Sequence, residues 1–375
     1  MTARVLVIGG GPAGMATAAS MRARGVAIRH IDRRGRVGGA YNRIHGDIVL
    51  TTPARLIGLP GLPFRPTADY VNVDEYRSYL HGFARRFALH AESCQVERIR
   101  RDGDGFAVHF TSARHALAAE VPVADVGWYR TVVVATGMFD FPRWPSIPGL
   151  ADDGPAGLAG LAGPAGPDRP AVRHADDWRG PAGLRGRRVL IVGGASSGVE
   201  LAEACASHGA LVTVSTRSGR MNALPRYVLG RDPTHLFFPG VHRAPRGLTR
   251  HACEHGYTAP GVALAFARLA AQSRIVLRRQ VIGFQGREAR FASGPPARFD
   301  AVFLATGYRH TTPLLPTGIA RTRAGHPRCH RCQSTSHPGL YFVGLPCAHK
   351  LTSAYLYGMA RDSADVARQI AQRGP

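Results

Sequence analysis

The sequence has 375 residues, of which 45% are hydrophobic, and a formal net charge of +23. Apart from its charge this is an ordinary globular composition, long enough for two domains that each bury a core. The basic residues are arginines except for Lys350, and they are dispersed rather than gathered in a stripe. Dispersed charge argues against a nucleic-acid partner and favours a solvated basic surface. An acidic carrier protein that presents the substrate stays open as a partner, and so does a homodimer.

No segment has the features of a membrane span or of a secretory signal. No apolar run approaches the ~20 residues that a transmembrane helix needs. Met1 leads directly into an apolar strand, without the basic, apolar and small-residue succession of a signal peptide. We therefore expect a soluble, cytoplasmic protein without a membrane partner.

The first predicted elements form a βαβ unit of the size that binds a dinucleotide. An apolar strand at 5–8 leads into a glycine-rich turn at 9–14, a helix over about 12–24, and a strand over 26–31 that ends on Asp32. The turn needs glycine because its backbone must approach a pyrophosphate while the helix N-terminus presents free N–H groups. Asp32 stands eighteen residues after the last glycine, where a carboxylate accepts hydrogen bonds from ribose hydroxyls. We assign FAD to this turn.

A second unit of the same design follows later in the chain. A strand at 189–192 leads into the turn GGASSG at 193–198, a helix over about 198–208 and a strand at 211–215. Thr216 and Arg217 come next instead of an acid. A hydroxyl and a guanidinium suit a 2′-phosphate, which a carboxylate would repel. We therefore assign NADPH, rather than NADH, to the second turn.

Two further strands predict how the domains are arranged. The strands at 132–134 and 302–304 both continue into Ala-Thr-Gly, which suits backbone that passes beside a bound cofactor. Because they flank the second turn, we expect an α/β fold with two dinucleotide-binding (Rossmann-like) domains, the NADPH domain inserted into the FAD domain. The expected boundaries are 1–150 for the first part of the FAD domain, 151–174 for an Ala, Gly and Pro-rich linker, 175–300 for the NADPH domain and 301–375 for the second part of the FAD domain.

The residues predicted to bind the two cofactors lie in these turns and strand ends. They are Gly9, Gly11, Pro12, Ala13, Gly14, Asp32, Arg33, Gly39, Thr136, Gly137, Gly193, Ala195, Ser196, Ser197, Gly198, Arg217, Thr306, Gly307, Gly344 and Leu345.

The order and spacing of the motifs resemble those of the flavin-containing monooxygenases, the class B flavoprotein monooxygenases that include the plant YUCCA enzymes. The resemblance covers nearly the whole chain. It implies that NADPH reduces FAD, that O2 is held as a C4a-(hydro)peroxyflavin, and that one oxygen atom passes to a small molecule, with N- or S-oxygenation favoured. The matching segments are GGGPAG at 9–14, VGGAYN at 37–42, LTTPAR at 50–55, LPGLPF at 59–64, VATG at 134–137, GGASSGVELA at 193–202, LATGYR at 304–309 and PGLYFVGL at 338–345.

Two positions depart from the family pattern. Of the fingerprint FxGxxxH before the NADPH turn only His174 is kept, since Asp168 and Pro170 occupy the Phe and Gly positions. Thr51 stands where many relatives have an Asn that contacts the oxygenated flavin, and its hydroxyl can still form a hydrogen bond. The resemblance places Lys350 near the flavin ring and the substrate opening. Thr51 and Lys350 are therefore the candidate catalytic residues.

An alternative function stays open on the same scaffold. An NADPH-dependent flavoprotein reductase or dehydrogenase would pass hydride or electrons to a disulfide or a quinone without inserting oxygen. A further alternative is a basic flavoprotein whose substrate is tethered to an acidic carrier protein.

The cysteines are expected to be reduced thiols. With no secretory signal, scattered cysteines favour free thiols over a disulfide framework. Cys329 and Cys332 form a CxxC pair with His326 and His337 nearby, which a redox pair or a zinc site would also explain. The pair precedes the last FAD strand instead of following the NADPH turn, and no second CxxC exists. We expect unligated surface thiols and no metal site.

Overall fold

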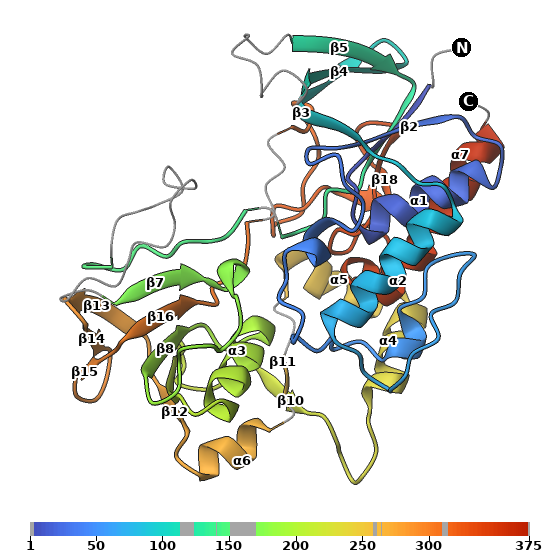
Figure 1. Ribbon diagram of the computed structural model, residues 1–375. Helices are drawn as coiled ribbons and strands as arrows, with labels where there is room; N and C mark the ends of the chain where they lie inside the picture. Colours follow the sequence, from blue (N-terminus) through green and yellow to red (C-terminus); the bar gives the residue numbers. More distant parts are fainter. Residues whose placement is uncertain are drawn as a thin grey trace.

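The computed structural model describes residues 4–112, 124–139, 141–150, 170–257, 261–263, 265–309 and 314–373. These residues form two α/β units, each built around a sheet with a parallel centre (Figure 1). The expected α/β fold with two dinucleotide-binding units is confirmed. None of the helices within these ranges is both long and apolar enough to cross a membrane.

The first unit has a sheet with the order β17-β18-β19-β6-β1-β2-β3-β4-β5. Its central strand β1 pairs in parallel with β2 on one side and β6 on the other, and all four β1 side chains are buried. Burial on both faces explains why this strand is a continuous apolar run. The strands are β1 (Val5–Ile8), β2 (Ile28–Asp32), β3 (Glu92–Asp102), β4 (Gly105–Ser112), β5 (Ala124–Tyr129), β6 (Thr131–Val134), β17 (Cys329–His330), β18 (Gln333–Ser334) and β19 (Leu340–Phe342).

Three helices cover this sheet. Helix α1 (Pro12–Arg22) has proline in its first turn, where no amide hydrogen bond is lost, and it packs against α7 (Leu356–Arg373). Helix α2 (Val73–Arg86) begins at Asn72, whose side chain accepts a hydrogen bond from the backbone N–H of Glu75 at 2.9 Å. Short 3-10 turns η1 (Gly39–Asn42), η2 (Ala54–Leu56) and η6 (Leu351–Ala354) complete the unit.

The second unit has a five-stranded parallel sheet with the order β12-β9-β8-β16-β7. The 3-10 turn η5 (Ala175–Asp177) follows β7, and helices α3 (Ser196–Ser207) and α6 (Phe266–Ala271) pack on the sheet. A small antiparallel sheet of β13 to β15 packs its phenylalanines against Leu190 and Leu304. The strands are β7 (Ala171–His174), β8 (Arg188–Val192), β9 (Leu211–Ser215), β12 (Ile275–Arg278), β13 (Val281–Gln285), β14 (Glu288–Phe291), β15 (Ala297–Arg298) and β16 (Ala301–Leu304).

Two segments belong to the second sheet that were expected elsewhere, one in the first domain and one in the linker. The sequence predicts that the FAD domain resumes at 301, but β16 pairs with β8 and β7 in the second sheet. Strand β7, expected to be the end of the linker 151–174, is an edge strand of the same sheet. An apolar run shows that a strand is buried but not which partner it pairs with. The rest of that linker, 151–169, lies outside the described residues.

The segment after β9 packs onto the first unit. Strands β10 (Ala223–Pro225) and β11 (Gly261–Ala263) pair in parallel, and between them α4 (Thr234–Arg243) and α5 (Arg246–His255) contact η6 (Figure 1).

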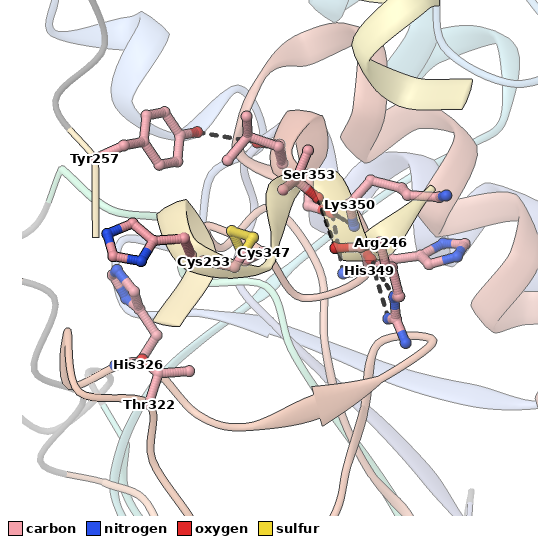
Figure 2. Close-up of a disulfide and its surroundings, with 12 residues drawn as sticks. Arg246, Cys253, Tyr257, Thr322, His326, Cys347, His349, Lys350 and Ser353 are labelled. Carbon is pink, nitrogen blue, oxygen red and sulfur yellow. Dashed lines mark hydrogen bonds between the residues drawn. A yellow bond between two sulfur atoms is a disulfide. The ribbon is translucent and has the colours of Figure 1, made fainter. Parts of the chain in front are cut away.

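A disulfide joins Cys253 of α5 to Cys347, 94 residues later in the chain (Figure 2). The prediction that all six cysteines are reduced is therefore wrong for this pair. The fold brings their Cα atoms to 5.6 Å, which spacing in the sequence does not reveal. Cys94, Cys205, Cys329 and Cys332 are free thiols.

Candidate functional site

The first glycine-rich turn contains two kinds of glycine. A Cβ on Gly14 would lie 1.8 Å from the carbonyl oxygen of Gly9, so this position must be glycine for α1 to pack on β1. Gly11 is different, because a Cβ there would meet only the Cα of Gly39 at 3.9 Å. The protein itself does not require glycine at this position. The free space at Gly11, at the N-terminus of α1, suits the close approach of a pyrophosphate.

A cavity of about 370 Å³ opens beside this turn. The predicted cofactor-binding residues that line it are Gly9, Gly11, Pro12, Ala13, Asp32, Arg33, Gly39, Thr136, Gly137 and Gly344. Two predicted residues of the first unit do not line it, because Gly14 lies behind the turn and Leu345 is buried. Residues that were not predicted also line it, among them Arg34, Gln95, Glu97 and Leu314.

Asp32 is held in place by the backbone at the edge of this cavity. Its Oδ2 accepts a hydrogen bond from the N–H of Gly10 and its Oδ1 accepts one from the N–H of Arg34, both at 2.8 Å. Each carboxylate oxygen can accept a further hydrogen bond. The residues present therefore fit the ribose and pyrophosphate of a flavin dinucleotide.

The second turn repeats the geometry of the first. A Cβ on Gly198 would lie 2.1 Å from the carbonyl oxygen of Gly193, just as a Cβ on Gly14 would clash with the carbonyl oxygen of Gly9. Gly193 also packs against the carbonyl of Ala305, the first residue of the second Ala-Thr-Gly. Ala195 takes the place of Gly11 and precedes α3, so a methyl group occupies the position that the first turn leaves open.

The polar residues after β9 lie at the surface of the second unit. The Thr216 hydroxyl donates to the carbonyl of Arg220 at 2.9 Å, and its methyl lies against Gly194. Arg217 is exposed. Arg217 follows the end of β9 and lines neither of the two cavities formed by the described residues, so its contact with the ribose end of a dinucleotide stays a prediction.

A second cavity of about 340 Å³ adjoins the first. Ser196 and Ser197 of α3 line it, and so does Thr51 from the first unit. Segments of both units thus form this cavity. The residues that line both cavities are Tyr41, Met138, Phe139 and Ala354.

These four shared residues were not predicted as site residues. Tyr41 belongs to the motif VGGAYN at 37–42, which offered a signal for it, and Met138 and Phe139 directly follow the first Ala-Thr-Gly. Ala354 offers no signal in the sequence. Only the packing of η6 beside Tyr41 brings it to the junction of the cavities.

Glu200 is a further cavity residue that the sequence did not single out. It lies one turn after Ser196 on α3, and the Ser196 hydroxyl donates to its Oε1 at 2.8 Å. Burial raises the pKa of the Glu200 carboxyl, while the Ser196 hydrogen bond lowers it and Glu203 raises it further. The second cavity therefore contains a carboxyl group whose charged form is disfavoured.

His174, kept from the family fingerprint, links β7 to the end of β16. Its Nδ1 accepts from the N–H of Asp176 at 3.1 Å, and its Nε2 donates to the carbonyl of Gly307 at 3.2 Å. Burial lowers the pKa of His174, which fits this neutral tautomer. The Thr306 hydroxyl donates to the carbonyl of Arg143. These contacts fix the second Ala-Thr-Gly but leave Thr306 and Gly307 outside the lining of both cavities.

The structure separates the two candidate catalytic residues. Thr51 lines the second cavity. Lys350 is instead bound to a helix end: its Nζ donates to the carbonyl of Ala244, the residue at the C-terminus of α4, at 3.1 Å. Lys350 does not line either of the two cavities formed by the described residues, and its place at the flavin ring stays a prediction.

The CxxC pair is not a pair of surface thiols. Cys332 is 1% exposed and Cys329 is half-buried. His326, considered as their partner, lies in the lining of the second cavity. The prediction of surface thiols is wrong because the β17–β18 hairpin turns Cys332 into the core of the first unit.

Comparisons with known proteins agree with these motifs. A family model described as pyridine nucleotide-disulphide oxidoreductase matches residues 3–228. Indole-3-pyruvate monooxygenase YUCCA8 of Oryza sativa subsp. indica is 26% identical over 98% of this chain and 90% of its own length. An uncharacterized CzcO-like oxidoreductase of Geobacillus kaustophilus is 23% identical over 96% of this chain and 95% of its own.

Solved structures share the fold. A flavin-containing monooxygenase from Stenotrophomonas maltophilia superposes with a TM-score of 0.74 at 22% identity, over 98% of both chains. Bacillithiol disulfide reductase from Bacillus cereus superposes with a TM-score of 0.70 at 18% identity, over 99% of both. The resemblance to flavin-containing monooxygenases is thereby confirmed.

Proposed function

We propose that this chain, which belongs to the pyridine nucleotide-disulphide oxidoreductase family, is an FAD- and NADPH-dependent monooxygenase that oxygenates nitrogen or sulfur in a small molecule. It is an oxidoreductase that works with a flavin and a nicotinamide cofactor. The observation that carries the proposal is the pair of adjoining cavities, one at the first glycine-rich turn and one beside Ser196 and Ser197 of the second, with four residues lining both.

The first cavity fits FAD. Gly11 leaves room for the pyrophosphate, and the N-terminus of α1 offers N–H groups to its charge. Asp32 would bind the adenosine ribose, since a carboxylate there favours a ribose without a 2′-phosphate. Gly344 and Met359 also line this cavity, from the end of the sheet and from α7, and Gly344 packs against Ala13 of the turn.

The second turn fits a nucleotide that binds reversibly. Ala195 keeps a methyl group where the first turn has open space, so the pyrophosphate is held less closely. Arg217 would bind a 2′-phosphate, which is the reason for proposing NADPH over NADH. This contrast between the two turns supports a resident flavin and a dissociable reductant.

The chain's own residues would position the reactants and exclude water. The flavin supplies hydride acceptance and the activation of O2. Tyr41, Met138 and Phe139 form a largely apolar wall between the cavities, which limits water at the reacting atoms. The Thr51 hydroxyl lines the second cavity from the first unit and would form a hydrogen bond there.

Isotope labelling tests oxygen insertion. The purified flavin-bound protein is mixed with NADPH and 18O2, and with methyl phenyl sulfide, N,N-dimethylaniline or cyclohexanone as probes. We expect the sulfide or the amine to speed NADPH oxidation and to yield a sulfoxide or N-oxide that carries one 18O atom. Product without label, or turnover that continues at the same rate without O2, would overturn the proposal.

A substitution at Thr51 tests its role in the same assay. Thr51→Val removes the hydroxyl and keeps the shape, while Thr51→Asn restores the amide expected from the family pattern. We expect Thr51→Val to divert most of the reducing equivalents to H2O2, and Thr51→Asn to keep product formation within about threefold. If the wild type and Thr51→Val convert the same fraction of the oxidised NADPH into oxygenated product, the hydroxyl has no role.

A disulfide reductase is the second candidate, because the fold is shared with the bacillithiol disulfide reductase. The anaerobic arm of the experiment separates the two. NADPH oxidation that depends on an added low-molecular-weight disulfide, without O2, would identify a reductase.

A further inference from the structure

Three metal-ligating side chains meet inside the first unit, outside the lining of both cavities. Cys332 comes from the β17–β18 hairpin, His349 from the loop after β19, and Asp362 from α7. Their ligand atoms all lie within 4.8 Å of one another. In the sequence these residues are separated by 17 and 13 positions and form no recognised motif.

The carboxylate of Asp362 is the unusual member of this cluster. It is completely buried, and its Oδ1 lies 3.2 Å from the Nδ1 of His349. Among the residues that the structure describes, its Oδ2 has no hydrogen-bond partner. An unpartnered buried carboxylate oxygen costs free energy unless a cation or a donor compensates it.

The other two ligands are held by their backbones. The N–H of Cys332 donates to Ala348 at 2.9 Å, and its carbonyl accepts from Phe342 at 2.8 Å. Around His349, the N–H donates to the Ser353 hydroxyl at 3.1 Å. The carbonyl of His349 accepts two hydrogen bonds from Arg246, at 3.1 and 3.0 Å (Figure 2). Ligands fixed in this way lose little entropy when they bind an ion.

We propose that Cys332, His349 and Asp362 bind a divalent transition-metal ion of the zinc class. Thiolate, imidazole and carboxylate are the ligands that Zn²⁺ takes in proteins. The Cys332 thiol loses its proton to solvent as the sulfur–metal bond forms, so that thiolate and carboxylate balance the charge of the ion. The His–Asp separation of 3.2 Å is already that of two ligands on one tetrahedral ion. Water is the fourth ligand, since Cys329 instead donates to the carbonyl of Pro327 at 3.4 Å.

The ion joins three segments around the end of the first sheet. His349 lies two residues after the disulfide-bonded Cys347 and three after Pro346, which lines the second cavity. The side chain of His349 is 19% exposed, so an ion can reach the site from solvent. The site therefore fixes the loop 345–350 to α7 and to the β17–β18 hairpin, independently of whether the protein is a monooxygenase or a reductase.

Cobalt titration of the full-length, flavin-bound protein tests the site. After removal of metal with a chelator, we expect one equivalent of Co²⁺ to bind with thiolate-to-cobalt absorption and tetrahedral d–d bands, and Zn²⁺ to displace it. Cys332→Ala, His349→Gln and Asp362→Asn are each expected to weaken binding by more than ~100-fold, since outer-shell partners alone contribute 10–100-fold. Cys205→Ala, a matched change at a buried cysteine of the second unit, is expected to leave binding unchanged.

Two results would overturn the proposal. One is wild-type protein that binds no stoichiometric Co²⁺ with a thiolate band, which decides the question even if the variants fail to fold. The other is binding that survives Asp362→Asn and His349→Gln but is lost in Cys329→Ala, because the ligands would then be the CxxC pair. Flavin absorbance and melting temperature show which variants are folded.

Discussion

Gly11 and Gly14 belong to one turn but need glycine for different reasons. Gly14 is fixed by the protein, since any side chain would meet the carbonyl of Gly9. Gly11 has φ −74° and ψ 177°, which any residue adopts, and it has open space around it. The open space at Gly11 is what the close approach of a bound pyrophosphate needs.

Gly11→Ala therefore separates flavin binding from folding. We expect the flavin-free variant to be as stable as the wild type or up to ~1 kcal/mol more stable, because alanine restricts the unfolded chain. We expect flavin affinity to fall at least tenfold. Melting of the flavin-free protein and a flavin titration measure the two effects, with Gly14→Ala as the control that loses stability. Unchanged flavin affinity in Gly11→Ala would mean that the pyrophosphate does not lie at this turn.

The carboxyl of Glu200 predicts a specific pH dependence of stability. Burial raises its pKa in the folded protein, so above the ordinary glutamate pKa of ~4.3 the unfolded chain loses this proton first. Between the ordinary pKa and the raised pKa, the free energy of unfolding therefore decreases as the pH rises. Glu200→Gln keeps an acceptor for the Ser196 hydroxyl and removes the penalty.

We thus expect the free energy of unfolding of Glu200→Gln, relative to that of the wild type, to increase as the pH rises from 4 to 8. Urea unfolding at several pH values measures it. Glu203→Gln is the neighbouring control, since Glu203 instead accepts hydrogen bonds from the N–H groups of Ala265 and Phe266. A relative stability of Glu200→Gln that does not change with pH would contradict the burial of this charge.

At the scale of the elements, Lys350 acts on the end of a helix. A cation at a helix C-terminus satisfies a free carbonyl and interacts favourably with the helix dipole. Its partner Ala244 precedes Pro245, whose ring prevents the helix from continuing. This contact gives Lys350 a structural role, while its catalytic role stays a prediction.

Lys350→Met is expected to lower the free energy of unfolding by about 0.5–1.5 kcal/mol, because it removes one charge-assisted hydrogen bond and keeps the apolar stem. Lys350→Arg is the matched variant and is expected to lose less. Urea unfolding and anaerobic flavin reduction by NADPH are measured side by side. Unchanged stability together with a tenfold slower reduction would contradict the structural role and support the predicted place of Lys350 at the cofactor site.

At the scale of the whole molecule, the disulfide joins α5, in the segment after β9, to the loop after β19 of the first unit. It closes a loop of 94 residues, for which the chain-entropy model gives about 4–5 kcal/mol. The double variant Cys253→Ala/Cys347→Ala is expected to lose about 2–5 kcal/mol. Chemical unfolding with and without reductant checks this. Reductant must destabilise the wild type and leave the double variant unchanged, and equal stability in all four measurements would contradict a structural bond.

Most of the fold and part of the site were predictable because their causes are local. Each glycine-rich turn places its strand, its turn and its helix within 30 residues, and steric demands inside the turn select the glycines. The strand partners of β7 and β16 were not predictable, since any buried apolar strand can pair with several others.

The sequence by itself determined two dinucleotide turns and the different residues, Asp32 and Thr216-Arg217, that follow them. Tertiary structure decided what lies between the turns. The junction at Tyr41 and Ala354, the disulfide at Cys347 and the grouping of Cys332 with His349 and Asp362 depend on segments distant in the chain. Such contacts arise only when the whole chain packs, because no single segment contains the shape of its partner.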